Sequence, residues 1–386
     1  MSIDYIKDNN ETFIPDNLKW SERMILSEIS RRGSSLAFQK SDKGRWDYTT
    51  GLLLLGIIKC YEINKDEKYF QYVKMIIDSF VDDDGKIKDY SIEEYNLDNI
   101  NNGKVFFYLY NYSLDKKYKK AIIQLMEQLK THPRTKEGGF WHKNIYPYQM
   151  WLDGIYMASP FYAEYSKVFD FAEGFDDVAN QIILIDKHTR DAKTCLLYHG
   201  WDESKKQEWA DSATGCSKNF WGRAIGWYLM GIIDVLDFLP PDHSQRPEII
   251  SIFKKTIDAV INFMDTTDVW YQVLDQESRE GNYHEASASN MFTYSLAKGV
   301  QNGFLDYDCK EIAFKAYDGI IKNFIEVESS GIVTLKNVCQ VAGLGREKRR
   351  DGTFEYYINE PVIKNDRKGT GAFILASLEI EKLKGL

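Results

Sequence analysis

The chain has 386 residues, of which 44% are hydrophobic and 14% aromatic, so it is long enough to bury a large core. Its formal net charge of −9 argues against nucleic acid as a partner, and an anionic substrate would need local cations. No stretch approaches the roughly 18 apolar residues of a membrane span, and the N-terminal residues lack a secretion-signal pattern. The five cysteines lack metal-ligand spacing, which favours free thiols in a reducing compartment. We therefore expect a cytoplasmic protein without a membrane partner.

Hydrophobic periodicity predicts about twelve helices of two alternating kinds. One kind is apolar nearly all round and follows a segment rich in glycine and aromatic residues, so its members should be buried on all sides. These segments are 52–63, 104–113, 155–165, 228–239, 291–300 and 372–380. The other kind is amphipathic, with one charged face. Clear examples are 68–81, 116–130, 246–264 and 310–325.

This alternation, repeated about every 50–60 residues, predicts a closed ring of helical hairpins, an (α/α)6 barrel. A further helix near residues 21–32 should pair with the last inner helix. Weak strand patterns disfavour an α/β fold, and the lack of a linker-like break favours one domain over residues 1–386. All inner helices of such a barrel start at the same end, so their first residues converge on one funnel. Helix N-termini there favour anions, and a carboxylate substrate would suit them.

The predicted ends of the inner helices bring several charged and aromatic residues to this funnel. They are Asp47, Asp98, Asp153, Arg223, Trp227, Glu285 and Lys368. An aspartate at a helix start is most often an N-cap, and for any one of them this is the simpler interpretation. Asp153 differs, because three aromatic residues stand within five positions of it. Burial among them should raise its pKa, and a second acid nearby, with Asp98 the best candidate, would raise it further. A carboxylic acid protonated near neutral pH is what general acid catalysis on a sugar requires.

Cations and histidines complete the candidate site. His199 lies between aromatic residues in a segment without helical or strand periodicity, and it is either a functional imidazole or a buried structural one. Lys143 and Arg223 are cations in otherwise aromatic surroundings, and each is either an ordinary ion pair or a clamp for a substrate carboxylate. Three other histidines show no metal-ligand spacing, so we predict no catalytic metal. The glycine pairs near 343 and 369 lack a phosphate-loop context, so we expect no nucleotide or other cofactor.

Four segments, in this order, resemble the unsaturated rhamnogalacturonyl hydrolases of glycoside hydrolase family 105. They are 138–157 (GGFWHKNIYPYQMWLDGIYM), 197–204 (LYHGWDES), 220–228 (FWGRAIGWY) and the run from 339 to 373. The resemblance implies an (α/α)6 barrel with its active site in the funnel. It also implies hydration of the C4–C5 double bond of a Δ4,5-unsaturated uronic acid at the non-reducing end. Ordinary glycosidases instead flank the glycosidic bond with two carboxylates.

Carried onto this chain, the resemblance implies that Asp153 protonates C4 and then takes a proton from the water that attacks C5. Asp98 would be the second essential acid. Residues at positions that the family uses for substrate binding are Tyr48, Lys143, Trp151, His199, Arg223 and Trp227. A mildly acidic pH optimum would follow, because Asp153 must start protonated.

The implied substrate is a small oligosaccharide, most simply unsaturated galacturonic acid linked to rhamnose, and the protein would act as a monomer or homodimer. An unsaturated glucuronyl hydrolase acting on another polysaccharide fragment is the main alternative. A sugar epimerase on the same barrel would need two facing histidines, and His199 is the only strong histidine candidate at the funnel. A carbohydrate-binding barrel without activity is disfavoured because both acids are present.

Overall fold

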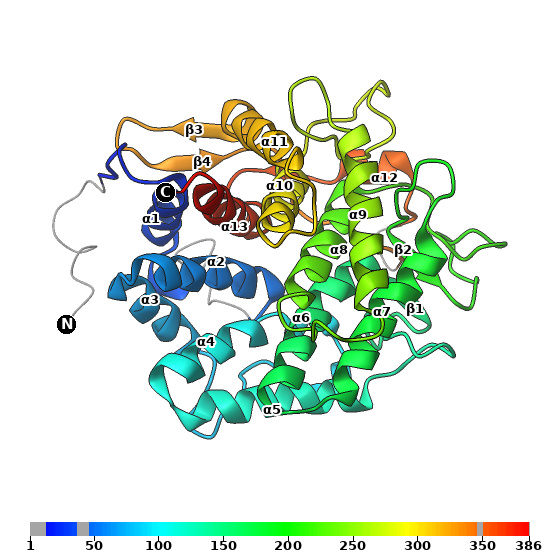
Figure 1. The fold of residues 1–386 in the computed structure, drawn as a ribbon, viewed down its shortest axis with the longest axis horizontal. Helices are drawn as coiled ribbons and strands as arrows, with labels where there is room; N and C mark the ends of the chain where they lie inside the picture. The colour runs from blue at the N-terminus through cyan, green and yellow to red at the C-terminus, as the bar shows by residue number, and fades with distance from the viewer. Residues whose placement is uncertain (1–12, 37–45, 346–349, 386) are drawn as a thin grey trace.

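The computed structural model describes residues 13–36, 46–345 and 350–385. Six helices of this part form an inner ring, in which each packs against the next and the last closes on the first (Figure 1). They are α2 (Tyr48–Asn64), α4 (Gly103–Ser113), α6 (Leu152–Val168), α8 (Gly222–Val235), α10 (Ala286–Gln301) and α13 (Arg367–Leu383). Each of these helices overlaps one of the six segments that are apolar nearly all round, although α8 ends at Val235, before the end of its segment at 239.

Outside this ring, each inner helix has one long neighbour. In chain order the outer helices are α1 (Trp20–Arg32), α3 (Glu67–Asp78), α5 (Lys116–Thr131), α7 (Glu173–Thr189), α9 (Arg246–Asn262) and α11 (Cys309–Phe324). α1 packs against α13, as expected for the N-terminal helix, and the other five pack against the inner helix that precedes them. The predicted (α/α)6 barrel is confirmed.

The difference between the two rings follows from burial. Every residue of α8 is buried, whereas α3 buries only the apolar side of its amphipathic pattern.

Close approach of the inner helices needs small residues. At Gly231 of α8, an added Cβ would lie 3.0 Å from the backbone nitrogen of Tyr156 on α6. Glycine at this position therefore lets α8 pack directly against the helix that carries Asp153.

Short antiparallel strand pairs connect the helices at several points, although the sequence showed no strand pattern there. β1 (Gln149–Trp151) pairs with β2 (Gly200–Asp202), and β3 (Ile325–Val327) pairs with β4 (Val333–Leu335). β5 (Val338–Cys339) pairs with β6 (Val362–Ile363). The segment after His199 thus does form a strand, but three residues are too few to show alternation in the sequence.

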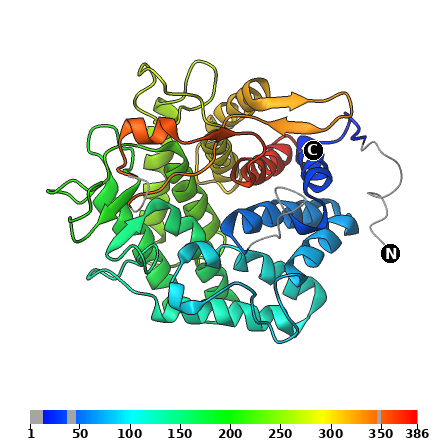
Figure 2. The ribbon, with the colours of Figure 1, turned by 180° about the vertical axis from the view of Figure 1, so that it is seen from behind.

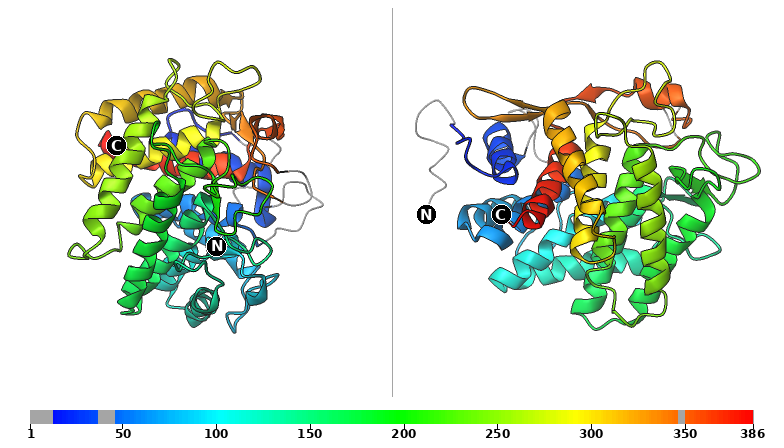
Figure 3. Two further views of the ribbon diagram at one scale, coloured as in Figure 1. Left: turned by 90° about the vertical axis from the view of Figure 1, so that its right-hand side faces the viewer. Right: turned by 45° about the horizontal axis from the view of Figure 1, so that its top comes forward.

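The chain between α11 and α13 crosses the barrel, from the β3–β4 hairpin to the short helix α12 (Phe354–Asn359) (Figures 2 and 3). On its way it contacts the beginnings of inner helices. The backbone nitrogen of Cys339 donates to Glu285, the N-cap of α10, and Val338 packs against Gly369 at the start of α13. This segment therefore lies at the end of the barrel where the candidate residues converge. Shorter 3₁₀ turns are η2 (Gly33–Ser35), η3 (Ile92–Glu94) and η4 (Leu97–Ile100).

All five cysteines are free thiols. Within the described ranges, none of the helices combines the length and the hydropathy that crossing a membrane would require.

Candidate active site

Asp153 and His199 are brought together by the β1–β2 pair. In this pair Trp151 stands opposite Gly200, and the backbone nitrogen of Leu152 donates to the carbonyl oxygen of His199 over 3.0 Å. Asp153 follows in the first turn of α6. Its Oδ2 lies 3.1 Å from His199 Nε2, with side chains 13% and 0% exposed, respectively. A carboxylate and an imidazole are therefore in direct contact in a largely dry site.

The structure corrects the expected pKa of Asp153. Burial alone would raise the pKa of this carboxyl, as the sequence suggested, but the charge and hydrogen bond of His199 lower it, and His142 adds to them. The net effect is a pKa below the ordinary value of an aspartate. The expectation was wrong because the sequence did not show the imidazole beside Asp153.

Asp98 lies in η4, just before α4, and is held by two basic groups. Lys143 Nζ donates to its Oδ2 over 2.5 Å, and His142 Nε2 lies 3.4 Å from its Oδ1. Asp98 does not cap this turn, because Asn96 is the N-cap and accepts from the backbone nitrogen of Asp98. Of the two interpretations of Lys143, the ion pair is the one present in this structure.

An aromatic stack contacts the histidines that lie beside the two acids. Trp151 stacks on His142 with ring centroids 4.4 Å apart and 18° between the planes, and its ring lies 4.7 Å from that of Tyr146. It meets His199 edge-on at 5.5 Å. Burial lowers the pKa of His142 to about 4, so this ring is neutral near pH 7. Trp151 thus packs against the histidine beside each acid and helps to fix the orientation of both rings.

Tyr48 and Trp227 form another part of the site. Tyr48 is the first residue of α2, and its ring meets Trp227 edge-on at 6.2 Å. Trp227 stacks on Tyr156 of α6, with ring centroids 4.8 Å apart. Because Trp227 is only 1% exposed, its ring serves to pack against Tyr48 and Tyr156. Burial raises the pKa of Tyr48, and the charge of Asp98 raises it further. The Tyr48 hydroxyl therefore stays protonated and lies within the field of Asp98.

Arg223 enters the site from α8 and is 1% exposed. Its Nη1 donates to the carbonyl oxygen of Cys339 and, over 3.2 Å, to Ser287 Oγ, and it lies 3.7 Å from Glu285 Oε1. Among the described residues, its Nε has no hydrogen-bond partner. Glu285 caps α10 through the backbone nitrogen of Ala288 and also accepts from that of Cys339. Arg223 is thus an ion-pair partner that keeps one buried donor unused.

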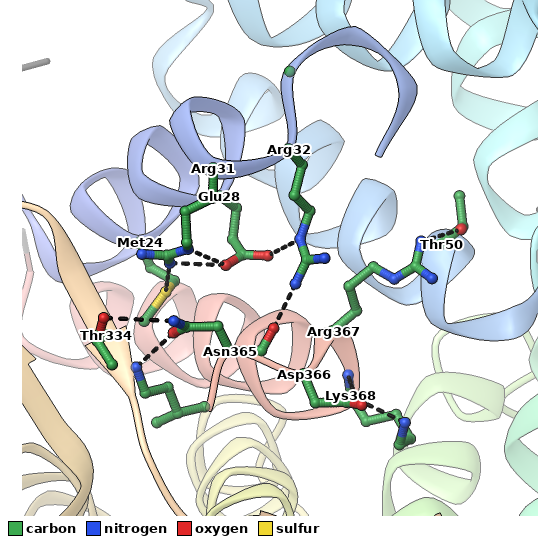
Figure 4. Close-up of polar contacts among 12 residues, drawn as sticks. Met24, Glu28, Arg31, Arg32, Thr50, Thr334, Asn365, Asp366, Arg367 and Lys368 are labelled. Carbon is green, nitrogen blue, oxygen red and sulfur yellow. Dashed lines mark hydrogen bonds and ion pairs between the residues drawn. The ribbon is translucent and has the colours of Figure 1, made fainter. Parts of the chain in front are cut away.

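The remaining candidates at the funnel have structural partners. Asp47 is the N-cap of α2, accepting from the backbone nitrogens of Thr49 and Thr50, so the capping interpretation is correct for it. It also pairs with Arg367 over 3.2 Å, and Lys368 pairs with Asp366 over 2.7 Å. Asp47, Tyr48, Arg367 and Lys368 help to line a cavity of about 500 Å³. Figure 4 shows the polar contacts around this cavity, including those that link Arg32 to Glu28 and to Asn365.

Tyr357 reaches the site from α12, and its hydroxyl lies 2.8 Å from His199 Nδ1. No group of three or more His, Cys, Asp and Glu side chains in the described part of the chain has an arrangement that could hold a metal ion. Asp98 and Asp153, each with a histidine beside it, are the groups that this site offers for proton transfer.

Residues 20–384 match the model of Glycosyl Hydrolase Family 88. The chain belongs to this family. It is a glycoside hydrolase, and the resemblance seen in the sequence is confirmed by its relatives.

Three known proteins are similar to this family 88 member over more than half of its length. A solved glycoside hydrolase of family 105 from C. acetobutylicum ATCC 824 is 46% identical, and the match covers 95% of this chain and 100% of that one with a TM-score of 0.91. Protein Atu3128 of Agrobacterium fabrum is 35% identical over 229 residues, which are 58% of this chain and 97% of the relative. The unsaturated rhamnogalacturonyl hydrolase YesR of Bacillus subtilis is 24% identical over 271 residues, 69% of this chain and 72% of YesR.

Two residues of the family 88 site, His142 and Tyr357, were missed by sequence reasoning. His142 was considered only as a metal ligand, although it stands beside Lys143 in the same motif. Glu285 was expected at the funnel, but without a role of its own. Tyr357 lies 158 positions from His199, and no local pattern could have connected them.

Proposed function

We propose that this protein removes Δ4,5-unsaturated galacturonic acid from the non-reducing end of oligosaccharides derived from rhamnogalacturonan, by hydrating the C4–C5 double bond. The observation that carries the proposal is the distance of 3.1 Å between Asp153 Oδ2 and His199 Nε2, because a carboxylate and an imidazole in contact can exchange a proton. The name of the relative YesR supports the substrate class.

The chemistry explains why this pair is needed. The unsaturated uronate is an enol ether, so a proton added at C4 leaves positive charge at C5, shared with the ring oxygen. Asp153 delivers this proton and then, as a carboxylate, takes one from the water that attacks C5. The resulting hemiketal opens, and the glycosidic bond breaks without attack at the anomeric carbon. Since one proton is delivered and one is recovered, Asp153 ends in its starting state.

Asp98 has a different role in this proposal. Its carboxylate is held by Lys143 and faces His142, so it stays in place and can stabilise positive charge that develops on the sugar. The net charge of −9 requires a cation for the substrate carboxylate, and Arg223 is the candidate because its buried Nε is unused within the described residues. Tyr48 and Trp151 supply aromatic surfaces for the sugar ring.

The contact between Asp153 and His199 disfavours an epimerase but does not exclude an unsaturated glucuronyl hydrolase. An epimerase would need an acid and a base that face each other across the sugar, whereas His199 directly contacts Asp153. An unsaturated glucuronyl hydrolase would use the same acid and the same steps, so only the substrate distinguishes it from the proposed function.

The test follows the loss of ultraviolet absorbance of the conjugated uronate. Rhamnogalacturonan lyase products and unsaturated glucuronyl disaccharides are each incubated with wild type, Asp153→Asn and Asp47→Asn. We expect decay with the galacturonyl substrate, a fall of about 10³-fold in Asp153→Asn, and near-normal decay in Asp47→Asn, since asparagine also caps helices well. Faster decay of the glucuronyl substrate would favour the alternative. Unchanged decay in Asp153→Asn would refute the assignment of the acid.

A further inference from the structure

His199 is contacted at both ring nitrogens by residues distant in the sequence. Nε2 lies 3.1 Å from Asp153 Oδ2, and Nδ1 lies 2.8 Å from the hydroxyl oxygen of Tyr357. Both Nε2 and Oδ2 are buried, and neither has a partner in hydrogen-bond geometry within the described ranges. The two nitrogens therefore face separate groups, one a carboxylate and the other a hydroxyl.

The position of the Tyr357 hydroxyl is fixed independently of His199. The Tyr357 side chain is 0% exposed, and its ring stacks on Trp221 with centroids 5.7 Å apart and 19° between the planes. Its carbonyl oxygen accepts a hydrogen bond of 3.0 Å from Gln272 Nε2. Trp221 also packs against the imidazole, at 4.7 Å between centroids. Ring and hydroxyl are thus held by packing, and the hydroxyl can determine which protonation state of His199 is preferred.

A hydroxyl can accept a hydrogen bond from Nδ1–H and can also donate one to a bare Nδ1. When both nitrogens carry protons, Nδ1–H donates to Tyr357 and Nε2–H faces the Asp153 carboxylate. If the Nε2 proton moves to Asp153, Nδ1–H still donates to Tyr357, so the transfer leaves no buried group unpaired. Without the hydroxyl, a buried Nδ1–H would lose its acceptor and be left unpaired, which is unfavourable. The neutral ring would then favour Nε2–H. Loss of the Nε2 proton from this form would leave an imidazolate without a proton on either nitrogen, so this form cannot serve as the proton donor to Asp153.

We propose that Tyr357 is a positioning residue that keeps Nδ1 of His199 protonated, so that Nε2 passes its proton to Asp153 before Asp153 protonates the substrate. This inference rests on the proposed function. It also explains how a carboxyl that is ionised in the resting enzyme can act as a general acid, since its proton comes from the neighbouring imidazole.

The steps balance without an outside proton source. The Nε2–H bond breaks and an O–H bond forms on Asp153, which leaves His199 neutral with its proton on Nδ1. The O–H bond then breaks as the C4–H bond forms from the electron pair of the double bond. Water adds to C5 and gives a proton to Asp153, which returns it to Nε2.

The experiment compares Tyr357→Phe, which keeps the ring, with Tyr228→Phe as a matched control. Tyr228 is also a fully buried tyrosine, but its hydroxyl contacts Ile182 and Asp186 on α7, outside the site. Protein with ¹⁵N-labelled histidine is studied by NMR without substrate, and the His199 signals are assigned by their absence in His199→Gln. We expect a protonated Nδ1 in wild type and Tyr228→Phe, and a bare Nδ1 with a protonated Nε2 in Tyr357→Phe.

Kinetics supply the second measurement. We expect kcat of Tyr357→Phe to fall about 10- to 100-fold with KM changed less than about threefold, because the variant loses proton delivery and keeps the binding residues. Unchanged nitrogen signals or an unchanged kcat in Tyr357→Phe would overturn the inference. So would an equal loss of kcat in Tyr228→Phe, which would indicate general damage to the fold. The NMR comparison uses no substrate, so its result is distinguishable from a failure of the proposed function, which Asp153→Asn tests.

Discussion

Lys143 and Asp98, 45 positions apart, form an ion pair of 2.5 Å whose side chains are 21% and 14% exposed. The pair joins the loop before β1 to the turn before α4, and it gives the second acid of the site a defined position. A salt bridge that is partly open to water adds little to stability. We therefore interpret the role of this ion pair as catalytic. Its loss should then lower activity while leaving stability nearly unchanged.

Substitution of Lys143 by glutamine tests this interpretation. We expect kcat/KM to fall about 10- to 100-fold, because Asp98 loses the group that fixes its carboxylate, while the free energy of unfolding changes by less than about 1 kcal/mol. Steady-state kinetics and urea unfolding are the measurements. Lys68→Gln is the control, since Lys68 pairs with Asp66 at the surface, over 2.7 Å. A loss of stability that matches the loss of activity would contradict the interpretation.

Arg223 gives a prediction about substrate binding. Arg223→Lys keeps the charge but removes Nε and the planar fork, so a clamp for the substrate carboxylate would be lost. We expect KM to rise at least about tenfold, equivalent to about 1.4 kcal/mol, with a smaller change in kcat. The measurement is a saturation curve on the unsaturated disaccharide, with the melting temperature as a check on folding. A fall in kcat at constant KM would assign Arg223 to the chemical step.

Two buried histidines predict how stability depends on pH. Burial lowers the pKa of both His132 and His142 from 6.5 to about 4. The unfolded chain therefore takes up protons at a higher pH than the folded protein does, and stability falls as the pH decreases from about 6.5 towards 4. At pH 5 each histidine should cost about 2 kcal/mol relative to pH 7.

Urea unfolding at pH 7 and pH 5 measures this cost. His132→Gln and His142→Gln should each reduce the difference between the two pH values, and the double variant should reduce it most. Because His132 lies outside the candidate site, its variant should keep activity at pH 7. An undiminished pH difference in both single variants would show that other groups cause it.

The packing of α8 on α6 gives a prediction about the position of Asp153. Gly231→Ala would place a Cβ 3.0 Å from the backbone nitrogen of Tyr156, and backbone cannot move aside as a side chain can. We expect a loss of about 1–3 kcal/mol in stability and a lower kcat, because α6 must shift. Gly56→Ala is the matched control, since its nearest neighbour is the Ile374 side chain. Unfolding and kinetic measurements that rank the two variants in the opposite order would contradict this argument.

The sequence contained enough to predict the barrel, because helices buried all round differ in composition from those with a charged face. It also showed Asp98, Asp153 and His199, since each stands in a motif or at the predicted start of an inner helix. It could not show that Asp153 contacts His199, because this depends on pairing between two three-residue strands about fifty positions apart. The wrong direction for the pKa of Asp153 followed directly from that missing contact. The contact of Tyr357 with His199 could not be predicted either, because these residues lie 158 positions apart and no local pattern connects them.

The β1–β2 pair has a consequence for how such enzymes diversify. Asp153 and His199 adjoin the ends of paired strands, and the backbone hydrogen bond from Leu152 to His199 sets their separation. Tyr48 and Arg223 stand at the beginnings of other helices, α2 and α8. Substitutions there can suit a new sugar while the distance between acid and imidazole stays the same. We therefore expect that new specificities can arise without rebuilding the proton-transfer pair.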